Sequence, residues 1–123
     1  YQVAAANKGI VVGTGNKVED FGVGFYTKYG DGGVDISPIG DCKKTDVWEL
    51  GRELKILDEI INAQPTDGLW VDGRTDEDQL GLSYKELEEA IDNPNSSNRE
   101  KYEKIRKLNL HKMESIPVCK IPN

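Results

Sequence analysis

A short apolar run that ends in a glycine-rich, charged segment most constrains the fold of this chain. Residues 10–12 are β-branched and lead directly into Gly13-Thr14-Gly15, and seven glycines lie between Gly13 and Gly33. In α/β proteins a strand that ends in a tight turn places polar groups at the carboxyl edge of a sheet, where nucleotides bind. The run therefore predicts an α/β fold with a buried strand at 10–13 and a nucleotide pocket beside residues 11–35.

Composition narrows the class of ligand and the compartment. The 123 residues suffice for one domain with a modest core, and the net charge of −6 argues against nucleic acid as the main partner. No apolar stretch approaches the roughly 20 residues of a membrane span, and we expect no signal peptide. Two cysteines, Cys42 and Cys119, could pair, but in an acidic, glycine-rich α/β chain reduced thiols and a cytoplasmic location are expected.

Periodicity and caps predict the helices. Tyr1–Asn7 is helix-compatible, and Thr45 is a candidate N-cap for a helix whose apolar side chains pack on a core. A shorter helix is expected at 57–63, and capping boxes at 83–86 and 97–100 open two more. The apolar residues expected to face inward are Val47, Leu50, Leu54, Leu57, Leu87, Ala90, Ile91, Tyr102, Ile105 and Leu108.

Two segments lack helical periodicity. Residues 66–82 are acidic and aperiodic, and loops of this length typically serve as lids or binding loops or are disordered. We interpret 66–82 as an active-site lid. The tail from Leu110 to Asn123 contains two prolines and is expected to be extended.

Several polar residues are candidate ligands, each with a simpler alternative. The Thr14 hydroxyl can bond a base or phosphate, or only its own turn. Glu19 can hold Mg²⁺, or be an ordinary solvated helix acid. Lys28 and Asp35 flank glycines that allow close ligand approach, which favours a site over a plain surface hairpin. Lys44 at a helix start is unfavourable without an anion, which suggests a phosphate.

The remaining motifs are weaker. His111 is the only histidine and is incidental more often than catalytic. The sequence contains no metal-ligand cluster and no Walker loop, and Gly13-x-Gly15 lacks the third glycine of a Rossmann fingerprint.

Six motifs follow one another along the chain: VVGTGNKVED, GFYTKYGDGGVDISPI, KKTDVWEL, QPTDGLW, DEDQLGLSYKELE and HKM. Taken together, they closely resemble the C-terminal half of NAD⁺ synthetase. The resemblance covers the whole chain, 1–123, and fits the ammonia-dependent type or the synthetase domain of the glutamine-dependent type. It implies part of a Rossmann-like ATP pyrophosphatase fold (adenine nucleotide alpha hydrolase-like) and a homodimer. The implied enzyme is a ligase that adenylates deamido-NAD with ATP, releases pyrophosphate, and lets ammonia displace AMP to give NAD⁺.

The resemblance also implies roles for individual residues. Thr14, Lys44 and Thr66 would contact ATP, and Glu19 would bind Mg²⁺. The implied deamido-NAD contacts are Lys28, Asp35, His111 and Lys112. No separate catalytic side chain is assigned, because the task is alignment of the reactants and exclusion of water.

Some family features are not in these residues. The family's S-G-G-x-D-S phosphate loop, a second Mg²⁺ ligand and an arginine for deamido-NAD are missing, so the 123 residues alone are expected to be inactive. The lid reads PTDGLW rather than the more usual PTADL. The alternative hypothesis is a non-catalytic nucleotide-binding or dimer-forming fragment.

Overall fold

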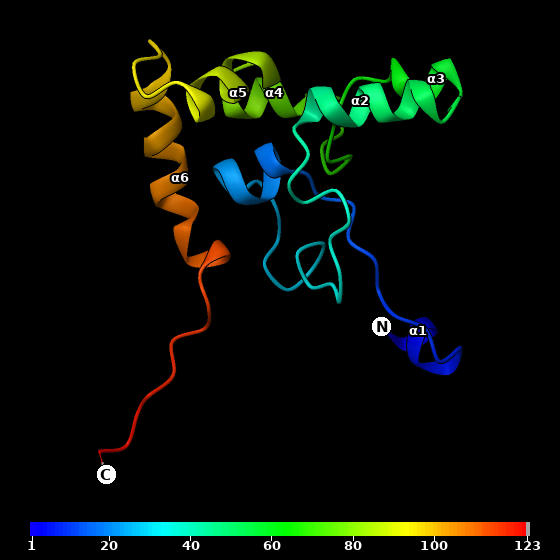
Figure 1. Ribbon diagram of the computed structural model, residues 1–123, viewed down its shortest axis with the longest axis vertical. Helices are drawn as coiled ribbons and strands as arrows, with labels where there is room; N and C mark the ends of the chain where they lie inside the picture. Colours follow the sequence, from blue (N-terminus) through cyan, green and yellow to red (C-terminus); the bar gives the residue numbers. More distant parts are fainter. Residues whose placement is uncertain (123) are drawn as a thin grey trace.

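The computed structural model describes residues 1–122. In Figure 1, helices α2 to α5 form an upper row, α6 descends at one end of it, and the π-helix η1 lies beneath. The elements in chain order are α1 (Gln2–Ala6), η1 (Lys17–Val23), α2 (Lys44–Glu53), α3 (Asp58–Ile61), α4 (Asp76–Leu80), α5 (Tyr84–Asp92) and α6 (Arg99–Met113). None of the helices within 1–122 is long and apolar enough to cross a membrane.

The core lies where η1, α5 and α6 meet. Val18 and Val23 of η1 and Leu87 and Ala90 of α5 are fully buried. The predicted box at Ser83 is confirmed: its hydroxyl accepts from Glu86 N, while the Glu86 carboxylate accepts from Ser83 N at 2.8 Å. Further core residues are Leu80, Leu82, Tyr84 and Tyr102. The packing of α5 therefore follows from its sequence pattern.

Side chains of α6 complete the hydrogen bonding of the end of η1. Arg106 donates to the carbonyls of residues 21 and 22, and Asn109 Nδ2 donates to the carbonyl of Val23 at 3.0 Å. Lys112 Nζ lies 2.8 Å from the carbonyl oxygens of both Gly24 and Tyr26. The last carbonyls of a helix have no partner within the helix. We call these three side chains the α6 ladder, and it fixes η1 against the core.

The predicted buried strand at 10–13 is wrong for these residues. Ile10 is 59% exposed and Val12 is 52% exposed, and the backbone makes a single parallel bridge, between Val12 and Ile36. A parallel strand becomes buried only when strands and helices cover it on both sides. The described residues supply only one neighbouring segment, so the run stays extended and exposed. The parallel bridge to Ile36 is the only strand pairing within 1–122.

The predicted burial of the α2 face is also wrong. Leu50, Leu54 and Leu57 are 45%, 72% and 67% exposed. The helix begins after Lys43, whose N–H donates to Asp46 at 2.8 Å, and not after Thr45. Periodicity identifies an apolar face but not the element that covers it; here α5 meets α2 near Trp48 instead.

Three boundaries differ from those expected. The aperiodic segment 66–82 contains α4, opened by a box between Thr75 and Asp78. The capping box predicted at 97–100 is wrong, because α6 begins after Asn98 without a side-chain cap. The predicted inward position of Leu108 is also wrong, because this side chain is 72% exposed. Helix α6 continues to Met113, so part of the expected extended tail is helical. A single turn such as α4 is too short to show a periodic pattern.

Candidate functional site

Four of the predicted ligand residues line one polar cavity of about 290 Å³. The loop before η1 supplies Thr14, and η1 itself supplies Glu19. Helix α2 supplies Lys44, and the segment after α3 supplies Thr66. The other lining residues are Phe25, Asp31, Pro65, Asp67 and Asp76. We call this the central cavity. Residues up to 62 positions apart in sequence thus share one small volume.

Two further cavities adjoin the central one, because they share lining residues with it. An apolar cavity of about 420 Å³ shares Lys44, Pro65 and Thr66, and is otherwise formed by α2, α3 and residues 56–64. A cavity of about 200 Å³ shares residues 25, 31 and 67, and includes Lys112. The row of three can therefore accommodate elongated ligands with apolar and anionic parts.

The ion pair between Glu19 and Lys44 lies at the wall of the central cavity. Asn16, only 2% exposed, caps η1 by accepting from the N–H groups of Val18 and Glu19 at 2.9 and 3.1 Å. Lys44 stands in the first turn of α2, where a cation is unfavourable. Its Nζ lies 2.8 Å from Glu19 Oε1, and the two side chains are 17% and 15% exposed. Glu19 supplies the anion that this lysine needs.

Tyr84 connects this ion pair to a buried acid. Its hydroxyl contacts Glu19 Oε1 and lies 2.9 Å from Asp76 Oδ2. Asp76 is 7% exposed, and its Oδ1 has no hydrogen-bond partner in the described part of the chain. Burial raises the pKa of Asp76, and burial together with Glu19 and Asp76 raises the pKa of Tyr84. The phenol has one hydrogen, so it cannot donate fully to both carboxyl groups at the same time.

A second polar contact joins α2 to α5. The Glu88 carboxylate, 8% exposed, accepts from Thr45 N at 3.0 Å and from the Thr45 hydroxyl at 2.7 Å. Trp48 packs edge-on against Tyr84 with ring centroids 6.2 Å apart. These contacts set the position of Lys44 relative to the core. Sequence reasoning treated Thr45 as a cap and did not find this link.

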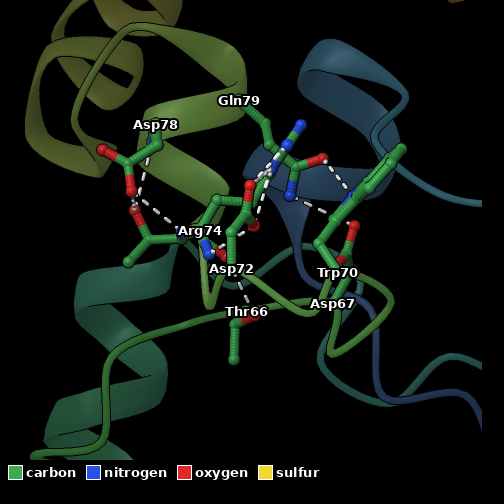
Figure 2. Close-up of polar contacts among 8 residues, drawn as sticks. Thr66, Asp67, Trp70, Asp72, Arg74, Asp78 and Gln79 are labelled. Carbon is green, nitrogen blue, oxygen red and sulfur yellow. Dashed lines mark hydrogen bonds and ion pairs between the residues drawn. The ribbon is translucent and has the colours of Figure 1, made fainter.

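Segment 66–75 is held by polar contacts with its own residues and α4 (Figure 2). The Thr66 hydroxyl donates to the carbonyl of Arg74 at 3.1 Å and accepts from Gly68 N at 3.1 Å. Gln79 joins Asp67 to Trp70, at 3.1 and 3.2 Å. These groups are exposed, so the segment is ordered by solvent-accessible contacts, the kind that open at low free-energy cost.

The turn before η1 is tightly packed against an acid. A Cβ on Gly15 would lie 1.9 Å from Asp20 Oδ2, so a larger residue here would require the Asp20 carboxyl group to move. Burial, with Glu19 and Asp31 nearby, raises the pKa of Asp20 to about 6. The central cavity therefore carries strong negative potential on the η1 side, which a cation can offset.

The predicted deamido-NAD residues are not all brought together. Lys28 Nζ donates to the backbone carbonyl of His111, and Lys112 lines the smallest cavity. Asp35 accepts from Val11 N at 2.7 Å, beside the Val12–Ile36 bridge. Lys28, Asp35 and His111 line none of the three cavities. Their ligand roles remain predictions.

Three polar residues of the cavity or its wall were not among the candidate ligands predicted from the sequence: Asp67, Asp76 and Tyr84. The acidic run 76–78 was visible in the sequence as part of a loop. Nothing in the sequence shows that Asp76 is buried, or that the first residue of α5 reaches across to Glu19. Burial of a polar group arises from tertiary packing and leaves no periodic signal.

Two threonine hydroxyls, one ammonium and four carboxyl groups line the central cavity, and convergent polar groups of this kind are typical of small-molecule binding sites. The chain belongs to the NAD synthase family, whose model matches residues 1–122. It is 55% identical over 82 residues to the NH(3)-dependent NAD(+) synthetase of Methanosarcina acetivorans, and this alignment covers 67% of this chain and 31% of the relative. It is 42% identical to that of Archaeoglobus fulgidus, over 98% of this chain and 50% of the relative.

Two solved structures have a similar backbone fold over most of this chain. The NMN synthetase from Francisella tularensis matches 98% of this chain and 51% of its own, with 33% identity and a TM-score of 0.89. The NH3-dependent NAD synthetase from Campylobacter jejuni, solved with nitrate, matches 98% and 49%, with 21% identity and a TM-score of 0.66. The chain thus spans about half the length, or less, of these relatives.

Proposed function

We propose that the protein carrying this sequence forms NAD⁺ from deamido-NAD, ATP and ammonia. The nicotinate carboxylate attacks the α-phosphorus of ATP and pyrophosphate leaves; ammonia then attacks the NAD-adenylate and AMP leaves. The observation that carries the proposal is the convergence of Thr14, Glu19, Lys44 and Thr66 on one cavity, in a chain whose family includes NH(3)-dependent NAD(+) synthetases. The corresponding fold is a Rossmann-like ATP pyrophosphatase fold.

Each cavity then has a task. Lys44 and the hydroxyls of Thr14 and Thr66 bind ATP oxygens in the central cavity, where the ammonium offsets charge that develops on the leaving pyrophosphate. Deamido-NAD lies toward Lys112 and Lys28, with Asp35 and His111 as further contacts. Segment 66–75 excludes water, so that ammonia and not water attacks the adenylate.

The donor set fits one Mg²⁺ shared with ATP. In the described residues, Lys44 and Tyr84 both contact the Glu19 carboxylate at Oε1, and no hydrogen bond to Oε2 is formed. No group of three His, Cys, Asp or Glu side chains in the described residues could hold a metal alone. Mg²⁺ commonly takes one or two carboxylates together with substrate phosphates and waters. Glu19 would hold the ion, which would supply positive charge to offset the charge of the phosphates.

A homodimer in the cytoplasm completes the proposal. The apolar side chains exposed on α2 and α3 (Leu50, Leu54, Leu57 and Ile60) offer a surface for a second copy. Unpaired Cys42 and Cys119 fit a reducing compartment. Sedimentation of the purified protein measures the oligomeric state, and a monomer at micromolar concentration would exclude the dimer.

The experiment is NAD⁺ formation by the purified protein, with Lys44→Ala as the test variant. We expect loss of ATP-dependent adenylation in Lys44→Ala and full activity in Lys104→Ala, an exposed lysine of α6 outside the three cavities. Unchanged turnover and ATP affinity in Lys44→Ala would contradict its role. Residues 1–123 alone should be inactive, and activity of that piece would contradict that expectation. ATP binding without any turnover would favour a non-catalytic nucleotide-binding protein.

A second candidate is amidation of nicotinate mononucleotide to NMN. The similarity to the Francisella tularensis NMN synthetase, with the higher of the two TM-scores, favours testing it. The same assay with the mononucleotide in place of deamido-NAD decides between them. A higher kcat/KM for the mononucleotide would assign the protein to NMN formation.

A further inference from the structure

Tyr84 contacts three charged residues that line the central cavity, Glu19, Lys44 and Asp76. It is the first residue of α5 and is 1% exposed, with its N–H donating to Glu77 at 2.8 Å. Its hydroxyl contacts Glu19 and lies 2.9 Å from buried Asp76. Its ring centroid lies 4.9 Å from Lys44 Nζ. One side chain thus contacts both members of the Glu19–Lys44 pair.

The position of Tyr84 is itself rigidly set. The Ser83–Glu86 box fixes the first turn of α5, Trp48 packs on the ring edge, and Glu88, one turn further along α5, holds Thr45 beside Lys44. A hydroxyl held this firmly can orient a carboxylate, because the cost of ordering it is already met by packing. Without it, Glu19 Oε1 keeps only Lys44 as a described partner.

We propose that Tyr84 is a positioning residue, whose hydroxyl and ring hold Glu19 and Lys44 in the geometry that binds ATP. This inference rests on the proposed function for the reaction that it serves. The residue touches no substrate; it acts through the ion pair. A core tyrosine with packing as its only role would need the ring but not the hydroxyl, so Tyr84→Phe separates the two.

The matched control is Tyr102→Phe. Tyr102 is 6% exposed in the same core and lines none of the three cavities. In Tyr84→Phe we expect pyrophosphate release to slow roughly 10- to 100-fold, as for loss of a hydrogen bond to a charged group. The KM for ATP should rise while the KM for ammonia stays unchanged. Tyr102→Phe should keep the kinetics of the unaltered protein.

The outcomes are separable from those of the proposed function. Partial unfolding would lower turnover without changing the KM for ATP, so a fall in turnover with unchanged KM, or an equal loss in both variants, overturns the inference. If the unaltered protein forms no amide, the proposed function fails, and the rise in melting temperature with Mg·ATP becomes the test. A smaller rise in Tyr84→Phe than in Tyr102→Phe then supports positioning, and equal rises overturn it.

Discussion

The η1–α5–α6 core and the α2–α3 arm (residues 44–61) differ in how their apolar side chains are covered. Leu87 of α5 is fully buried, whereas Leu54 and Ile60 of the arm are 72% and 64% exposed. The two regions meet at the central cavity, where η1 supplies Glu19 and the arm supplies Lys44. One wall of the cavity is therefore fixed by packing within the chain, while the other depends on a few contacts with α5.

The polar groups follow the same division. The carbonyls that end η1 are satisfied by the α6 ladder. Segment 66–75, which continues from the arm, uses exposed side chains for its hydrogen bonds, and its Leu69 and Val71 are exposed as well. Exposed contacts of this kind are weak individually. This site therefore combines a rigid acidic wall with a wall that can move.

The largest expected difference lies in paired leucine truncations. Leu87→Ala should lower the free energy of unfolding by about 2–5 kcal/mol, because it leaves a cavity in the core. At concentrations where the protein is monomeric, Leu54→Ala should change it by less than about 0.5 kcal/mol, since most of that side chain is exposed in the single chain. Urea denaturation of the protein measures both. A loss of several kcal/mol in Leu54→Ala would show that another surface covers the arm.

Two glycines with nearly the same backbone angle provide a sharper pair. Gly24 (φ 68°) ends η1, and a Cβ there would lie 2.5 Å from Asn109 Cβ; Gly68 (φ 66°) has nothing within 4 Å. We expect Gly24→Ala to cost about 2–4 kcal/mol, from left-handed strain plus overpacking. Gly68→Ala should cost about 1 kcal/mol, from strain alone. Equal melting temperatures for the two variants would remove the contrast.

The smallest effect concerns pH. The pKa of Asp20 is raised from 3.8 to about 6, so between about pH 4 and 6 the folded state binds more protons than the unfolded state. The free energy of unfolding should therefore fall as pH rises through that window. Asp20→Asn should remove this part of the dependence and stabilise the protein by about 1 kcal/mol above pH 6, after allowance for solvent screening. Stability curves at pH 4 to 8 that coincide for both proteins would contradict this.

The sequence predicts those parts of the fold that depend on neighbours along the chain. The Ser83 box and the inward side chains Leu87 and Ala90 need only local patterns. The exposed positions of Leu54 and Ile10 depend on which other segments are present to cover them. A helical or β-branched pattern carries no information about that partner.

The candidate site divides in a similar way. Motif resemblance placed Thr14, Glu19, Lys44 and Thr66 in one site, and they line one cavity. The resemblance did not supply the links that hold them, through Tyr84, Asp76 and the Thr45–Glu88 contact. These links join side chains across 8 to 65 positions of sequence, and their residue types are ordinary for surface helices.

The α6 ladder limits what one of the predicted ligand lysines can do. An ammonium group has three hydrogens, and Lys112 already directs two of them to backbone carbonyls. It can therefore offer a bound nucleotide one hydrogen and a charge that two carbonyl dipoles already share. Lys28 contacts a single described carbonyl, that of His111, and retains two hydrogens. Of the two lysines, the one outside the cavities is the better-equipped donor, and the one inside serves the fold first.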